Sequence, residues 1–86
     1  MSIDVQEIRK EIRNYIKENF LFGYNDEELL DDTSFLKIGV LDSTGIMELV
    51  AFLQREYKIS ILDEDITPDN LDSIDFITNF LLKKLQ

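Results

Sequence analysis

Apolar side chains recur at helical spacing in three stretches of the chain. Intervals of three and four residues place such side chains on one face of a helix. The stretches predict helices over residues 3–20, over about 43–57, and from Asp72-Ser73 to the end of the chain. Their apolar positions are Val5, Ile8, Ile12, Tyr15 and Ile16; Ile46, Leu49, Val50, Leu53 and Tyr57; and Ile74, Ile77, Phe80, Leu81 and Leu85.

The two connecting segments lack this regular pattern. From Leu21 to Val40 the apolar positions are irregular and are interrupted by Gly, Asn and Asp. We interpret this segment as a long loop pinned to the core, with one helical turn at residues 26–30. Residues 58–71 are predicted to form a connector with a short helical turn near 63–66.

The connector also contains the alternating segment "ISILDED", which would suit a short strand. No other segment has a period of two, so a strand here would have no partner to pair with. We therefore predict an all-α fold over a single domain, residues 1–86. It is a small four-helix bundle of three main helices and one short helix, with the long loop between the first and second helices.

The composition argues against a catalyst. The chain has 86 residues and contains neither cysteine nor histidine, which excludes Ser-His and Cys-His catalysis, disulfides and the usual zinc sites. The acidic segment "LDEDITPDNLDS" does not form a calcium loop either. Pro68 stands where such a loop needs glycine, and Ile74 stands where it needs the bidentate glutamate. We expect neither enzymatic activity nor a metal site.

Charge is concentrated in the middle of the chain. The net charge is −9, and residues 26–75 hold 14 acidic against three basic residues. This field repels nucleic acid and would steer basic protein surfaces toward the chain, although it would equally serve solubility. The first ten residues show no signal-peptide pattern, and no apolar run is long enough to span a membrane. We expect a cytoplasmic monomer without membrane insertion.

Leu-Asp-Ser occurs twice, in "GVLDSTG" (residues 39–45) and in "NLDSIDF" (residues 70–76). Helix capping by Asp or Ser explains both copies. The bulky residues after Ser73 indicate a helix start that serves packing. After Ser43 the first turn contains Gly45, which costs about 1 kcal/mol relative to alanine. Because Gly45 has no side chain, we interpret this turn as an opening through which another protein's backbone approaches the serine hydroxyl.

Ser43 is therefore the candidate for modification. A helix start favours an attached phosphate, and Asp42 could cap the helix if Ser43 were esterified. The chain encodes no base near Ser43 that could activate it, so another enzyme must modify it.

The stretch "FLKIGVLDSTGIMELVAFLQREYKI", set between two amphipathic helices, resembles the acyl carrier proteins. Their signature is Asp-Ser-Leu at the start of the second helix, and the resemblance covers essentially the whole chain. It implies that Asp42-Ser43 is the attachment site for 4′-phosphopantetheine, transferred from coenzyme A to Ser43. The group would supply the thiol that the chain lacks, and acyl or aminoacyl groups would be carried on it as thioesters.

The resemblance also implies the partners. A phosphopantetheinyl transferase would modify the chain, an acyl- or aminoacyl-activating (adenylating) enzyme would load it, and an acyltransferase or synthase would receive the cargo.

Thr44 replaces the leucine of most members. Gly45 and Arg55 stand where fatty-acid carriers usually place acidic residues. The spelling Gly-x-Leu-Asp-Ser-x-Gly is closer to the D-alanyl and similar stand-alone carrier proteins.

Residues around the serine are predicted to contact partners. They are Leu41, Thr44, Ile46, Met47, Glu48, Asp63, Glu64 and Asp65. For Leu41 and Ile46 the alternative is a hydrophobic staple around the cap, and for the acids it is a solvated turn. A cleft for a short acyl chain could be lined by Met47, Val50, Leu62 and Ile66, although core packing also explains these four. The alternative to a carrier is an unmodified acidic adaptor with the same fold.

Overall fold

The structure is a computed structural model that describes residues 4–20 and 29–85. The three main helices are α1 (Val5–Phe20), α3 (Ser43–Tyr57) and α5 (Ile74–Leu85). Three short helices lie between them: α2 (Phe35–Ile38), the 3-10 helix η2 (Asp63–Asp65) and α4 (Pro68–Leu71). These described ranges contain no strand, which confirms the all-α class, and none of their helices is long and apolar enough to cross a membrane.

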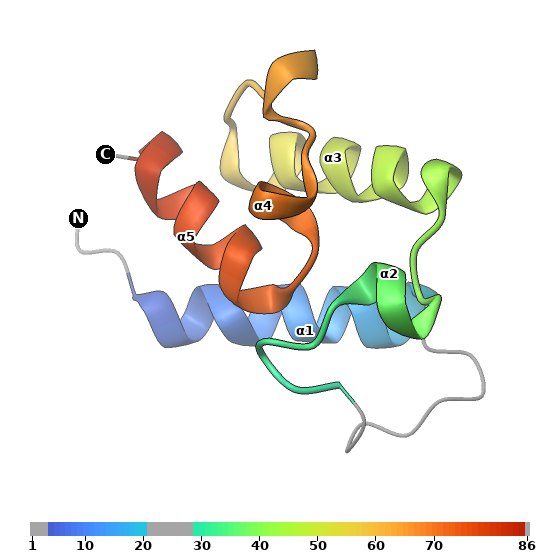
Figure 1. Ribbon diagram of the computed structural model, residues 1–86. Coiled ribbons are helices and arrows are strands. Elements are labelled where there is room, and N and C mark those ends of the chain that lie inside the picture. Colours follow the sequence, from blue (N-terminus) through green and yellow to red (C-terminus); the bar gives the residue numbers. More distant parts are fainter. Residues whose placement is uncertain (1–3, 21–28, 86) are drawn as a thin grey trace.

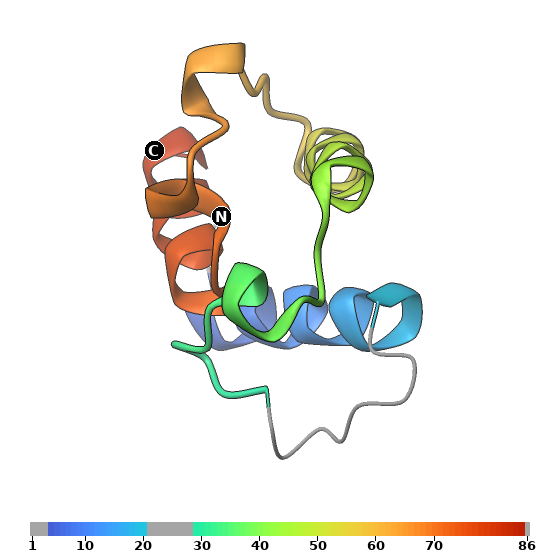
Figure 2. The ribbon, with the colours of Figure 1, turned by 45° about the vertical axis from the view of Figure 1, so that its right-hand side comes forward.

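The three main helices surround one hydrophobic cluster. In the view of Figure 1, α1 runs along the base, α3 lies above it, and α5 rises from α1 on the left with α4 packed against it. Figure 2 shows α3 nearly end-on, across from α5. The predicted apolar stripes face inward. Residues with no exposed side-chain surface include Ile12, Ile16, Leu49, Leu53, Ile77 and Leu81.

The connecting segments contain more helix than the sequence predicted. The turn near 63–66 is present as η2, but α2 falls inside the predicted loop and α4 inside the predicted connector. Most of the helical turn expected at 26–30 lies outside the described residues, and Leu29 and Leu30 are not helical. The described residues thus contain two short helices beyond the one that was predicted. Both α2 and α4 are four-residue helices without an amphipathic repeat.

Helix α2 is stabilised by a residue far along the chain. The N–H groups of Phe35 and Leu36 donate to the carbonyl oxygen and to Oδ1 of Asp72, at 2.8 and 2.9 Å. The Lys37 N–H donates to Oγ of Ser34 at 3.2 Å, and the Ser34 hydroxyl in turn donates to Oδ2 of Asp72. The first N–H groups of a helix have no partner within it, and so short a helix is unstable alone. Asp72 supplies most of the hydrogen-bond partners that the first turn of α2 lacks.

Two arginines of α1 fix the chain that leads into α2. Arg13 donates to Oδ1 of Asp31 at 2.5 Å and to the Leu29 carbonyl at 2.6 Å. Arg9 pairs with both Asp31 and Asp75, and Asp75 also donates its N–H to the Asp31 carbonyl at 2.8 Å. The segment around Asp31 is thereby held between α1 and the first turn of α5.

Candidate functional site

In the first Leu-Asp-Ser copy the aspartate caps the helix. Asp42 has an extended backbone, and its Oδ1 accepts a hydrogen bond from the Gly45 N–H at 2.7 Å. Ser43 is the first residue of α3 and is exposed. Its hydroxyl therefore lies outside the cap, at the N-terminus of a 15-residue helix.

In the second copy the serine caps the helix instead. Oγ of Ser73 accepts from the Phe76 N–H at 3.0 Å, and the residue is only 2% exposed. The aspartate of this copy, Asp72, is occupied by α2. The interpretation of the second copy as a structural helix start is confirmed.

Gly45 has a different role from the one predicted. It is buried, and a Cβ built there would lie 3.1 Å from both Leu41 Cδ2 and Phe20 Cε1, and 3.3 Å from Oδ1 of Asp42. The glycine thus permits close packing of the first turn of α3 against α1 and against the cap. The interpretation as an opening for a partner's backbone is wrong, because the glycine faces the protein's own interior.

The connection from α2 to Ser43 is short and well anchored. Gly39 ends α2 with φ of 73°, a left-handed conformation that glycine adopts without steric cost. Val40 and Leu41 then bury their side chains, with 8% and 3% exposed. Leu41 therefore packs in the core and offers almost no side-chain surface to a partner. This anchoring directs Ser43 outward.

Several of the predicted contact residues do surround the serine at the surface. Thr44, Met47 and Glu48 are exposed on α3, and Ile46 is half-buried. Met47 follows Ser43 by four residues and so lies on the same side of the helix, with 55% of its surface exposed. An apolar side chain so exposed, next to Glu48, gives this part of α3 a mixed apolar and acidic surface.

The acids of η2 divide into two kinds. Asp63 and Glu64 are exposed, and η2 lies at the top of both ribbon views, away from α1 (Figures 1 and 2). Asp65 is half-buried and accepts from the Leu62 N–H at 3.0 Å and from Nζ of Lys84 at 2.9 Å. The backbone hydrogen bond first, and Lys84 second, hold the pKa of Asp65 below its ordinary value. Asp65 thus connects η2 to α5.

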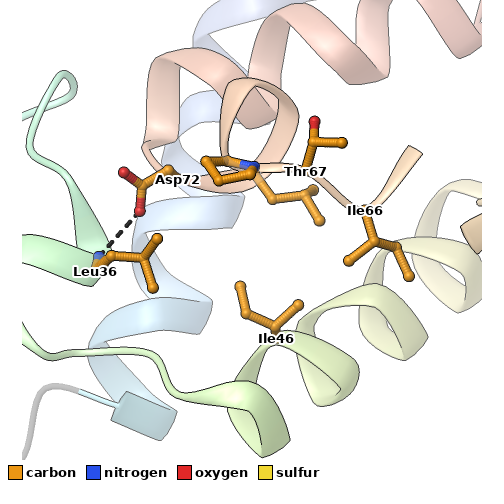
Figure 3. Close-up of a pocket in the computed structure, with 7 residues that line it drawn as sticks. Leu36, Ile46, Ile66, Thr67 and Asp72 are labelled. Carbon is orange, nitrogen blue, oxygen red and sulfur yellow. Dashed lines mark hydrogen bonds between the residues drawn. The ribbon is translucent and has the colours of Figure 1, made fainter. Parts of the chain in front are cut away.

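A cavity of about 110 Å³ lies beside the first turns of α3. Figure 3 shows Leu36 and Asp72 on one side of it, with Ile46 and Ile66 pointing in from the other sides. Ile46 comes one helical turn after Ser43. The lining residues are Leu36, Ile46, Ile66, Thr67, Pro68, Leu71 and Asp72.

Only Ile66 was correctly predicted as a cleft residue. Met47 and Leu62 are exposed, at 55% and 52%, and Val50 is buried in the core. The sequence pattern could not indicate the other lining residues, because the cavity wall includes α2 and α4, whose short segments carry no periodic signal. Ile46 was instead predicted to contact a partner or to form a hydrophobic staple around the cap.

The described side chains offer little chemistry of their own. In residues 4–20 and 29–85 no group of three acidic side chains is placed to hold a metal ion. Ser43 is exposed at the N-terminus of α3, and a small cavity lies one helical turn away.

Comparison with known proteins gives the following relatives, while no family model matches the chain. The chain is 33% identical over 67 residues to probable acyl carrier protein PigG of Serratia sp., covering 78% of this chain and 76% of that protein. It is 34% identical over 82 residues to the acyl carrier protein of Buchnera aphidicola subsp. Acyrthosiphon pisum, covering 93% of this chain and 100% of that protein. It is likewise 34% identical, over 74 residues, to the acyl carrier protein of Buchnera aphidicola subsp. Schizaphis graminum.

Proposed function

Because the chain belongs to the acyl carrier protein family, we propose that it carries acyl or aminoacyl groups as thioesters on a 4′-phosphopantetheine arm attached to Ser43. One observation supports this choice of residue above all others. Ser43 is exposed at the start of α3, whereas the capping role falls to Asp42. The serine can therefore be esterified without loss of the cap.

The residues around Ser43 suit such a group. The first-turn amides of a helix and the helix dipole favour a phosphate, and α3 is long enough to provide both. When bound, the group supplies the thiol that this cysteine-free chain lacks. The chain itself anchors and presents the arm, since Gly39, Val40 and Leu41 direct the serine outward.

We further propose that the exposed part of α3 and the acids of η2 form the partner surface. Thr44, Met47 and Glu48 flank the serine, and Asp63 and Glu64 extend the negative charge. A transferase, an adenylating enzyme and an acyltransferase or synthase would each meet this surface with basic residues around an apolar centre. The two glycines of the motif, Gly39 and Gly45, favour an aminoacyl cargo such as D-alanine. We also propose that residues 1–86 act as one monomeric domain in the cytoplasm.

The cavity beside Ile46 is the proposed shelter for the cargo. It starts one helical turn from Ser43, and its walls are mainly apolar. A short acyl chain placed there would leave water and would be shielded from nucleophiles until a partner draws it out.

The modification itself is tested by intact mass. The purified chain is incubated with coenzyme A, magnesium and a permissive phosphopantetheinyl transferase. We expect a mass increase of one phosphopantetheine group in the unaltered chain, in Ser60→Ala and in Ser73→Ala, and none in Ser43→Ala. Ser60 is the matched control, because it is an exposed serine outside the proposed partner surface.

Two results would contradict the proposal. If the unaltered chain gains no mass, the adaptor alternative is favoured, in which the acidic fold binds partners without a prosthetic group. If Ser43→Ala still gains mass and Ser73→Ala does not, the arm is attached to the second copy.

A further inference from the structure

Asp72 connects α2 to the cavity in two ways. Its side chain is part of the lining, and its carboxylate and carbonyl hold the first turn of α2. Leu36 lies on the same side of the cavity, and its N–H donates directly to Oδ1 of Asp72 (Figure 3). The position of the Leu36 side chain therefore depends on Asp72.

The contact is reinforced by a third residue. Ser34 caps α2 through the Lys37 N–H, and its hydroxyl donates to the second carboxylate oxygen of Asp72. Both oxygens of Asp72 thus bind the beginning of α2. Helix α2 has only four residues, and Leu36 is 54% exposed, so little packing of Leu36 itself would hold this wall in place.

We propose that Asp72 is a positioning residue: it holds α2 in place, sets the volume of the cavity and thereby limits the length of acyl chain that the carrier shelters. The proposal rests on the carrier function proposed above. It assigns a role to the aspartate of the second Leu-Asp-Ser copy, whose serine is only a helix cap. It also attributes the limit on cargo length to the side of the cavity that α2 forms.

The size of the cavity gives the limit. A cavity of about 150 Å³ lined by apolar residues accommodates benzene, which has six carbon atoms. At about 110 Å³, the cavity beside Ile46 has room for a chain of about four carbon atoms. A butyryl group should fit, whereas an octanoyl group would leave about half of its length outside while α2 keeps the position it has in this structure.

The role of Asp72 in holding the first turn of α2 can be tested on the unmodified chain. Amide hydrogen exchange should show that Phe35 and Leu36 are protected. Asp72→Ala should remove the protection of Leu36, whose acceptor is the carboxylate, more than that of Phe35, whose acceptor is the main-chain carbonyl. Glu11→Gln is the control, because it removes a carboxylate that binds the Tyr57 hydroxyl between α1 and α3, away from α2. Equal protection in Asp72→Ala and the unaltered chain would overturn the proposal.

The limit on chain length is tested on the loaded carrier. Acetyl, butyryl, hexanoyl and octanoyl forms are prepared, and the rate at which hydroxylamine cleaves each thioester is followed by intact mass. Each methylene sheltered from water favours the sheltered position of the chain by roughly fourfold, so butyryl, with two more methylenes, should be cleaved about fifteenfold more slowly than acetyl. Protection should not increase further for hexanoyl and octanoyl.

Asp72→Ala should lose this dependence on chain length, with butyryl cleaved about as fast as acetyl, while Glu11→Gln keeps it. Should Asp72→Ala prove too unstable to load, Ser34→Ala removes only the bridging hydroxyl and should flatten the profile in part. The thermal midpoint of each variant shows whether a general loss of stability accounts for the change. An unchanged profile in a loaded, folded Asp72→Ala overturns this inference alone, whereas failure to load Ser43 overturns the carrier function and this inference with it.

Discussion

The two Leu-Asp-Ser copies differ by one position in where the helix begins. Both leucines are buried, but α3 begins at the serine of its copy and α5 begins after the serine of its copy. Asp42 caps α3 and leaves Ser43 exposed, whereas Ser73 caps α5 and is buried. The same three residues thus produce an accessible hydroxyl in one place and an inaccessible one in the other.

The cause of this difference lies outside the tripeptides. Asp72 binds the N-terminus of α2, so it is not available to cap α5 and the serine takes that role. Nothing competes in this way for Asp42 among the described residues. The exposure of a serine next to an aspartate therefore depends on whether a third element engages the aspartate.

The largest expected difference between the copies concerns the aspartates. Asp72→Ala should lower the free energy of unfolding by about 3 kcal/mol, because two hydrogen bonds from the start of α2 to a charged group are lost. Asp42→Ala should cost about 1 kcal/mol, the ordinary value for one N-cap. Urea denaturation of the unmodified chains measures both. Equal losses would show that Asp72 does not hold α2 as described.

The residue after each serine gives the next difference. Ile74 is completely buried, and Ile74→Thr should cost about 2 kcal/mol, because packing is lost and a hydroxyl enters the core. Thr44 is exposed at the equivalent place, so Thr44→Ile should change stability by no more than about 0.5 kcal/mol. The same denaturation experiment applies. A large effect at Thr44 would indicate that the first turn of α3 is less open than the structure has it.

The serines themselves give the smallest difference. Ser73→Ala removes a helix cap and should cost about 1 kcal/mol. Ser43→Ala should change the free energy of unfolding by less than about 0.5 kcal/mol. Thermal denaturation monitored by circular dichroism separates these values, and a cost at Ser43 as large as that at Ser73 would contradict the capping assignment.

The long amphipathic helices could be predicted from the sequence because each carries its own signal. The apolar stripes of α1, α3 and α5 are internal to each segment, and the observed α3 agrees with the predicted range. Helix α2 carries no such signal, since its stability comes from Asp72, 36 positions beyond Leu36. Contacts of this kind are invisible to a pattern read along the chain.

The candidate site was predictable to a similar degree. The choice of Ser43 rested partly on Gly45, and the glycine does mark this copy, but for internal packing against Phe20 and Leu41. A glycine that permits close packing and a glycine that admits a partner look the same in a sequence. The cavity was mispredicted because its walls include α2 and α4, and because the exposed side of α3 at Met47 could not be distinguished from the side at Ile46.

The bond between α2 and Asp72 also has a consequence for the order of folding. Contacts between residues far apart in sequence form only after the intervening chain has been closed into a loop, at an entropic cost. Helix α2 needs Asp72 and therefore cannot become stable until the start of α5 has docked. The serine at the start of α3 is capped by its own neighbour and needs no such partner. In a newly made chain, the proposed attachment point would be complete before the cavity proposed to shelter the cargo.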